Sequence, residues 1–190
     1  MDWTSELVPY AITVCGVDEL PDFSGHPITH VLSILDPGIP PPEAFSDYPA
    51  HARLDVRFHD CIKPMEGQTP ASRADVDLIL AFGRDLETHA SPAHLLVHCQ
   101  MGVSRSTASM LLLLAQTRPD VPADDLMTEV ARIRPRAWPN SHLVRLGDAL
   151  LARGGTLLEA ARNQHRARLA IQPQIGDFFR SVGRAEEVEE

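Results

Sequence analysis

The sequence predicts a single-domain α/β protein with an open, mostly parallel sheet of four or five strands and helices that flank this sheet. Short apolar segments with strand character alternate along the chain with segments of helical periodicity. The 190 residues suffice for one domain with a sizeable core, and the chain contains no internal repeat. One apolar segment also runs through a tight loop directly into a helix, an order typical of the carboxyl edge of a parallel sheet.

Four segments are expected to form strands. Residues 10–15 and 28–35 are apolar segments, and each is followed by turn residues. Residues 53–58 alternate charged and apolar side chains, which predicts a strand with one buried face. Residues 95–97 form a short apolar strand directly before the loop.

Helices are expected between and after these strands. Ser72 followed by Asp75 has the pattern of a capping box, which predicts the start of a helix that runs to about residue 89. Ser141 is expected to cap a later helix that ends near residue 153. Further helices are predicted from the loop to about residue 118, over 124–133 and over 156–169. We expect residues 1–170 to form the domain and residues 171–190 to form a C-terminal tail that is partly disordered.

Composition excludes several classes of function. The net charge of −9 argues against a nucleic-acid partner. No apolar run approaches the roughly 20 residues that a membrane-spanning helix needs, and the first residues lack the features of a secretory signal. The three cysteines are widely spaced, which indicates a reducing, cytoplasmic environment. No Cys/His cluster has the spacing of a metal site, so neither a metal nor a cofactor is expected, and the oligomeric state stays open.

The loop between residues 99 and 105 has the composition of an anion-binding site. A helix N-terminus presents unpaired N–H groups and a partial positive charge, and a loop that curls over this end adds more N–H groups. Gly102 permits the turn, and Arg105 offers a planar guanidinium that matches two phosphate oxygens. The residues expected to bind phosphate are Gln100, Met101, Gly102, Val103, Ser104 and Arg105.

Cys99 stands at the entrance of this loop, where the positive field favours a thiolate and therefore a nucleophile. Ser106 is placed to donate a hydrogen bond to the sulfur and to stabilise the thiolate when it leaves. His98 is expected to orient the loop through a hydrogen bond without a direct chemical role. A single cysteine is more often a small buried apolar residue, but the joint pattern His-Cys-x5-Arg-Ser between a strand and a helix argues against that interpretation.

Residues 98–106, His-Cys-Gln-Met-Gly-Val-Ser-Arg-Ser, resemble the signature loop of the cysteine-dependent protein tyrosine phosphatases, in particular the small dual-specificity-like branch. The order of elements over about residues 8–155 is similar to that family as well. The resemblance implies removal of phosphate from phosphotyrosine in proteins, and in a shallow cleft also from phosphoserine and phosphothreonine. It further implies a phosphocysteine intermediate and an aspartate on a separate loop as general acid.

Asp60 is the expected general acid, because it lies just past the strand 53–58 at the start of a loop that is rich in Pro and Gly. If this strand and 95–97 are parallel, their carboxyl ends share one edge and Asp60 meets Cys99. His59 and Glu66 remain competitors for the role. The chain lacks the Trp-Pro-Asp form of the general-acid loop that receptor-like tyrosine phosphatases have.

Other residues near these motifs have less definite roles. Asn140 either positions water and braces the loop or caps a helix. The cluster Arg132, Arg134 and Arg136 either adds positive potential to the site or forms a solvated helix face. A reversible disulfide between Cys99 and either Cys61 or Cys15 is a further hypothesis.

Two rival functions remain open. One is a catalytically weak phosphate-binding module that captures phosphorylated partners. The other is a different Cys-x5-Arg enzyme, such as an arsenate reductase or a sulfurtransferase. The loop interior, residues 100–103, contains no lysine, which disfavours polyphosphoinositide substrates.

Overall fold

Four parallel strands form the central sheet in the order β1-β4-β2-β3. The computed structural model describes residues 5–88 and 92–189. The strands are β1 (Ala11–Gly16), β2 (His30–Leu35), β3 (Ala52–Arg57) and β4 (His94–Cys99). All three pairings are parallel. The predicted α/β architecture and its four strand segments are therefore confirmed, and β4 extends to Cys99 itself.

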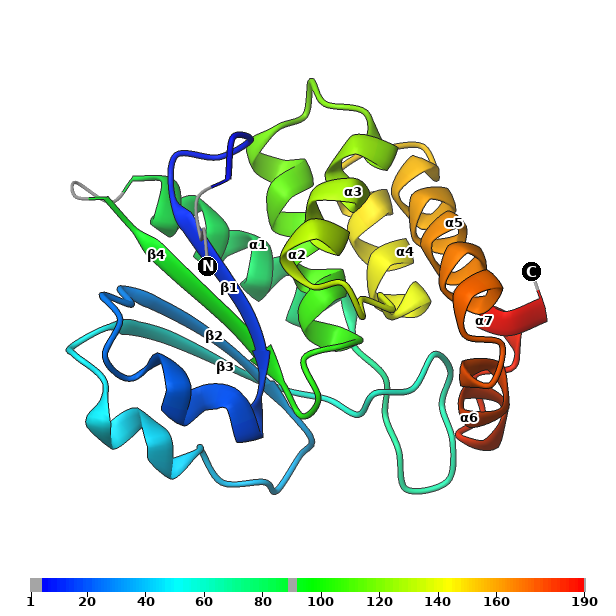
Figure 1. Ribbon diagram of the computed structural model, residues 1–190, viewed down its shortest axis with the longest axis horizontal. Coiled ribbons are helices and arrows are strands. Elements are labelled where there is room, and N and C mark those ends of the chain that lie inside the picture. The colour runs from blue at the N-terminus through cyan, green and yellow to red at the C-terminus, as the bar shows by residue number, and fades with distance from the viewer. Residues whose placement is uncertain (1–4, 89–91, 190) are drawn as a thin grey trace.

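The two faces of the sheet are covered differently (Figure 1). Five helices cover one face: α1 (Arg73–Glu87), α2 (Arg105–Thr117), α3 (Ala123–Ile133), α4 (Ser141–Leu150) and α5 (Thr156–Ile171). The 3₁₀ helices η1 (Val17–Phe23) and η2 (Glu43–Asp47) cover the other. The larger apolar core lies between the sheet and the five helices, and a smaller one lies under η1 and η2.

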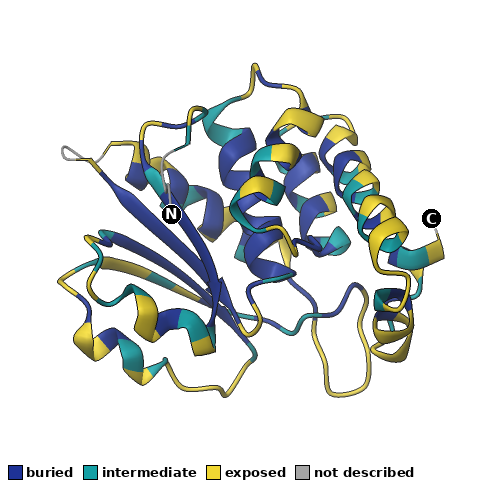
Figure 2. Ribbon diagram, viewed as in Figure 1, coloured by how far each residue is buried: buried dark blue, intermediate teal, exposed yellow. Residues whose placement is uncertain are grey.

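Helix α2 lies at the centre of the larger core. Every residue from Arg105 to Ala115 is buried, and in Figure 2 this helix is dark blue over most of its length. It contacts α1, α3, α4 and the strands β1 and β4. Such a helix has almost no freedom to shift, so the loop that precedes it is held at both ends, by β4 and by α2.

The N-terminal caps of α1 and α4 are formed by side chains close in sequence. The capping box at α1 is confirmed: the Asp75 N–H donates to Ser72 Oγ at 3.2 Å, and the Ser72 N–H donates to Asp75 Oδ2 at 2.7 Å. At α4 the prediction of Ser141 as cap is wrong, because the Leu143 N–H donates to Oδ1 of Asn140 at 3.0 Å. Helix α4 also ends at Leu150, earlier than predicted, since the chain turns through positive φ angles just beyond it.

The C-terminal segment, which the sequence assigns to a tail, contains two short helices. Residues 175–181 form α6 (Ile175–Ser181), and residues 186–189 form α7 (Glu186–Glu189). Both pack beneath α5 (Figure 1). Phe179 of α6 stacks on Trp138 with ring centroids 4.1 Å apart, and Trp138 Nε1 donates to Glu187 at 2.8 Å. The contacts of Phe179 and Glu187 hold this segment against the domain. Two such residues within a polar segment are too few to produce a hydrophobic periodicity in the sequence.

No helix in the described parts of the chain is long and apolar enough to cross a lipid bilayer.

Candidate active site

The loop between β4 and α2 turns its carbonyl groups outward. A planar trans peptide places each N–H opposite the preceding carbonyl, so the N–H groups of residues 101–104 face the inside of the loop. No described residue accepts a hydrogen bond from these N–H groups. The carbonyls of residues 100–103 accept from Val17 N, Arg136 Nη2, Arg134 Nε and Trp138 N, respectively, at distances of 2.9 to 3.1 Å.

Gly102 allows the loop to approach the end of β1. Its φ of +65° is a conformation that L side chains rarely adopt, and a Cβ atom there would lie 2.4 Å from the carbonyl carbon of Cys15. The loop backbone therefore packs directly against the backbone of β1, and only glycine fits.

Two arginines and one glutamate hold the outer side of the loop. Arg134 pairs with Glu19 at 2.5 Å, Arg136 pairs with Glu19 at 3.2 Å, and Glu19 Oε2 accepts from the Gly16 N–H at 2.6 Å. Burial raises the pKa of Glu19, but Arg134 and the Gly16 N–H outweigh burial and hold it below its usual range. Sequence reasoning left these arginines between two roles; they bind loop carbonyls, whereas Arg132 pairs with Glu129 of its own helix.

Cys99 and Ser106 meet inside the loop. Cys99 is almost fully buried, and its Sγ lies 3.2 Å from Oγ of Ser106, which is buried as well. The contact expected between the serine hydroxyl and the sulfur is thus present. Cys99 lines a cavity of about 560 Å³.

Arg105 is the first residue of α2, and its side chain is only 3% exposed. Its Nη1 donates to the Phe58 carbonyl at 2.7 Å and to Asp36 Oδ1 at 2.5 Å. Its buried Nε has no hydrogen-bond partner among the described residues. Nη1 of the guanidinium is thus held by two acceptors, Nε by none of the described residues, and Arg105 lines the cavity. Asp36, just past the end of β2, orients this arginine.

Asp60 lies at the same edge of the sheet, as the parallel-strand argument predicts, and lines the cavity together with Cys99. Its Oδ1 accepts from Ser104 Oγ at 2.8 Å, from Asn140 Nδ2 at 2.9 Å and from Arg184 Nη1 at 3.1 Å. Burial raises the pKa of Asp60, but the guanidinium groups of Arg184 and Arg105 outweigh burial and hold it below its usual range.

The two competitors of Asp60 are placed differently. His59 lines the cavity, and its Nδ1 accepts from the Thr69 N–H at 3.0 Å. Glu66 is exposed and does not line the cavity. Oδ1 of Asn140 caps α4, which is one of the roles expected of this residue, while its Nδ2 donates to Asp60.

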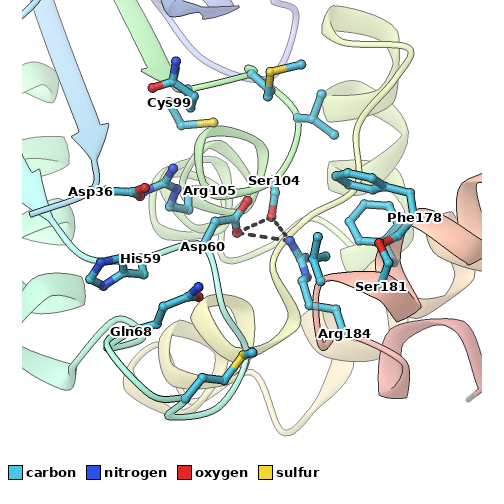
Figure 3. A pocket seen from close by; sticks show the side chains of 16 residues that line it. Asp36, His59, Asp60, Gln68, Cys99, Ser104, Arg105, Phe178, Ser181 and Arg184 are labelled. Carbon is cyan, nitrogen blue, oxygen red and sulfur yellow. Dashed lines mark hydrogen bonds and ion pairs between the residues drawn. The ribbon is translucent and has the colours of Figure 1, made fainter. Parts of the chain in front are cut away.

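Arg184, from the segment between α6 and α7, is a site residue that sequence reasoning missed. In Figure 3 it reaches Asp60 and Ser104 from the wall of the cavity opposite Cys99. Exposed apolar side chains also surround the cavity mouth, namely Met65, Met101, Phe178 and Val182. An anion-binding floor is thus surrounded by an apolar rim.

The side chain of His98 lies on the face of β4 opposite α2. Neither ring nitrogen makes a hydrogen bond of regular geometry with a described residue, and the ring packs 5.4 Å from that of Phe45. Burial lowers the pKa of His98 to about 4. Strand alternation explains this position, because successive side chains of β4 point to opposite faces: Leu95, Val97 and Cys99 pack on the helix side, whereas His98 packs on the side of η2.

The same alternation bears on the disulfide hypothesis. Cys15 pairs in register with His98 and packs in the smaller core, on the face opposite Cys99. All three cysteines are free thiols, and burial raises the pKa of both Cys15 and Cys61. The Cys99–Cys15 pairing therefore has no geometric support.

No family model and no curated protein matches the sequence. Solved structures do match. Human DUSP28 is 20% identical over 77% of this chain and 97% of that chain, with a TM-score of 0.57. A human tyrosine phosphatase-like serine/threonine/tyrosine-interacting protein is 18% identical over 78% and 95%, with a TM-score of 0.57. A mouse putative dual specificity phosphatase is 22% identical over 78% and 89%, with a TM-score of 0.52.

The chain therefore has the fold of the small dual-specificity phosphatases, which is the fold that its loop predicts.

Proposed function

We propose that this protein hydrolyses phosphomonoesters, removing phosphate from phosphotyrosine and also from phosphoserine and phosphothreonine in proteins through a phosphocysteine intermediate. One observation carries the proposal. The buried sulfur of Cys99 shares a cavity with Arg105, whose Nε has no hydrogen-bond partner among the described residues, next to a loop whose amides at 101–104 face inward. These donors suit the three outer oxygens of a phosphoryl group.

In the first step the thiolate of Cys99 attacks phosphorus while the bond from phosphorus to the ester oxygen breaks. The electron pair of that bond goes to the ester oxygen, which takes a proton from the carboxyl group of Asp60. Arg105 and the loop amides hold the outer oxygens throughout, so preorganised charge stabilisation supplies most of the rate enhancement.

In the second step water attacks the phosphocysteine and gives its proton to the carboxylate of Asp60. The phosphorus–sulfur bond breaks, and the electron pair returns to the sulfur of Cys99. Ser106 Oγ, 3.2 Å from the sulfur, donates a hydrogen bond that stabilises the departing thiolate. Inorganic phosphate leaves, and Asp60 is protonated for the next cycle.

The rim of the cavity supports an aryl phosphate as substrate. Met101 and Phe178 are each more than 60% exposed at the mouth, where an aromatic ring carried by the phosphate can pack. The loop interior has no lysine to hold a second phosphate group, which weighs against polyphosphoinositides. A phosphotyrosine side chain combines the dianion and the ring that these surfaces suit.

The test is turnover of p-nitrophenyl phosphate, with Cys99→Ser as the decisive variant and Cys61→Ser as its matched control. Cys99→Ser is expected to abolish turnover, and acid quenching of the wild type is expected to trap phosphate on Cys99, visible by mass spectrometry. The specificity of the enzyme is then ranked by comparing its turnover of phosphotyrosine, phosphoserine and phosphoinositide substrates. Binding of phosphopeptides without any turnover by the wild type would replace this proposal with the phosphate-binding module.

A further inference from the structure

We propose that Arg184 is a positioning residue for Asp60: it holds one carboxylate oxygen so that the proton needed by the leaving group resides on the other. This inference rests on the proposed phosphatase function. It concerns a side chain of the C-terminal segment, 124 positions along the chain from its partner.

Arg184 is fixed before any substrate binds. Its side chain is 2% exposed, and the guanidinium lies 4.9 Å from the ring centroid of Phe179. Nε donates to Glu187 Oε2 at 2.8 Å, and Nη2 forms an ion pair with the same oxygen at 2.6 Å. Glu187 is held in turn by the Trp138 indole N–H at 2.8 Å and the Ser141 N–H at 2.7 Å.

The fixed guanidinium presents Nη1 to the site. Nη1 donates to Asp60 Oδ1 at 3.1 Å and to Ser104 Oγ at 2.8 Å, and the Ser104 hydroxyl donates a hydrogen bond to the same Oδ1 at 2.8 Å. With the Asn140 amide, three donors occupy Oδ1. An oxygen that accepts three donors has no room for a proton, whereas Oδ2 receives no hydrogen bond from a described residue.

Protonation of Asp60 is therefore directed to Oδ2. In Figure 3 the dashed lines from Ser104 and Arg184 end at one oxygen of Asp60, and none ends at the other. A general acid must present its proton to the leaving oxygen in one geometry, and a carboxyl group that can rotate loses that alignment. The three donors on Oδ1 prevent this rotation.

The charges around Asp60 decide when it carries the proton. Two guanidinium groups face it, from Arg184 and from Arg105 of α2. Each has its own anionic partner, Glu187 for Arg184 and Asp36 for Arg105. His59 and the thiols of Cys61 and Cys99 are the other titratable groups around it. With Arg184 in place, the pKa of Asp60 is held below its usual range, so the acid form is available over a lower pH range.

The test compares two substrates whose leaving groups differ in basicity. The p-nitrophenolate of p-nitrophenyl phosphate leaves without much protonation, while the phenolate of phenyl phosphate requires a general acid. Arg184→Met is expected to lower kcat for phenyl phosphate roughly tenfold more than kcat for p-nitrophenyl phosphate, a fraction of the roughly 10²–10⁴-fold effect of a positioned acid. The alkaline limb of kcat/KM should move to higher pH. Arg180→Met, at an exposed position of α6, is the matched control and should change neither quantity.

A double-mutant cycle separates positioning from general loosening of the structure. In the Asp60→Asn background, Arg184→Met should have no further effect on the ratio of the two substrates. Equal losses for both substrates, or an additive effect in the cycle, would overturn the proposal. Arg184→Lys keeps the positive charge but cannot reach the carboxylates of both Asp60 and Glu187. It should therefore restore the alkaline limb of kcat/KM more fully than the ratio of kcat for the two substrates.

A direct titration keeps this inference separate from the proposed function. The ¹³C resonance of the Asp60 carboxyl, assigned with Asp60→Asn, should titrate at higher pH in Arg184→Met than in the wild type. This shift in titration is expected even if the wild type hydrolyses no phosphate ester. Such a lack of activity would refute only the proposed function. An unchanged Asp60 titration in a folded Arg184→Met protein refutes the role of Arg184.

Discussion

Asp36, just past the end of β2, accepts a hydrogen bond at 2.5 Å from Nη1 of Arg105, 69 positions later in the chain. The contact exists because β2 and β4 are parallel neighbours, so the residues after each strand meet at one edge of the sheet. Asp36 holds Nη1 of the guanidinium, while Nε has no hydrogen-bond partner among the described residues.

Asp36→Asn should weaken the binding of inorganic phosphate or tungstate about tenfold, because a charge-assisted hydrogen bond that orients Arg105 is replaced by a weaker one. Isothermal titration calorimetry measures the affinity directly. Asp47→Asn, on an exposed part of η2, is the control. Tighter anion binding by Asp36→Asn would show that the negative charge of Asp36 matters more than the orientation it provides.

Gly102→Ala should destabilise the fold by about 3 kcal/mol or more, because strain at positive φ adds to a clash with the backbone of Cys15. Gly67→Ala is a matched control, since Gly67 also has a positive φ (+69°) but a Cβ there meets nothing within 4 Å. We expect this control to cost only about 1–2 kcal/mol. Urea unfolding of both variants gives the comparison, and equal losses would contradict the close approach of loop and strand.

Arg134→Met should lower kcat/KM by roughly tenfold to a hundredfold, because the loop carbonyl of Gly102 loses its donor and the anion cradle is less well aligned. Arg132→Met removes a guanidinium that pairs with Glu129 on the same helix, so it should have little effect. Steady-state kinetics with p-nitrophenyl phosphate checks both. Equal activity of the two variants would mean that the loop does not depend on this brace.

The free energy of unfolding should fall as pH decreases from about 6.5 to 4. Burial lowers the pKa of His94, His98 and His165 from 6.5 to about 4 in the folded state, so the unfolded state binds more protons within this window. Each histidine contributes a slope of about 1 kcal/mol per pH unit. Urea unfolding at several pH values measures the slope, and His98→Leu should reduce it by the share of one histidine.

Phe179→Ala should cost about 3–5 kcal/mol in unfolding free energy, because a buried ring that stacks on Trp138 is removed. It should also make α6 more sensitive to limited proteolysis. Phe178→Ala, at the adjacent position with a side chain that is 61% exposed, is the natural control and should cost little. Unchanged protease sensitivity of Phe179→Ala would argue against this ring as the anchor of the C-terminal segment.

The position of Asp60 near Cys99 followed from the sequence, since parallel strands bring their carboxyl ends to one edge. The capping box of Ser72 and Asp75 followed as well, because a cap depends on residues three positions apart. The cap of α4 was misplaced by one residue, as Asn140 and Ser141 both suit that role and only the backbone path distinguishes them.

The interaction partners of the site residues could not be predicted from the sequence. Arg184 binds Asp60, and Glu19 binds Arg134, across 124 and 115 positions of chain. No local pattern joins such residues, because their meeting depends on the order β1-β4-β2-β3 and on where α6 and α7 pack.

By itself, the sequence determined the α/β class, the strand–loop–helix around Cys99 and the residue types in the loop, because these depend on side-chain periodicity and on turns of a few residues. Only the tertiary structure decided which charges face one another: Asp36 with Arg105, and Arg184 with Asp60. The physical reason is that an ion pair forms wherever packing brings two side chains together, and packing is a property of the whole chain.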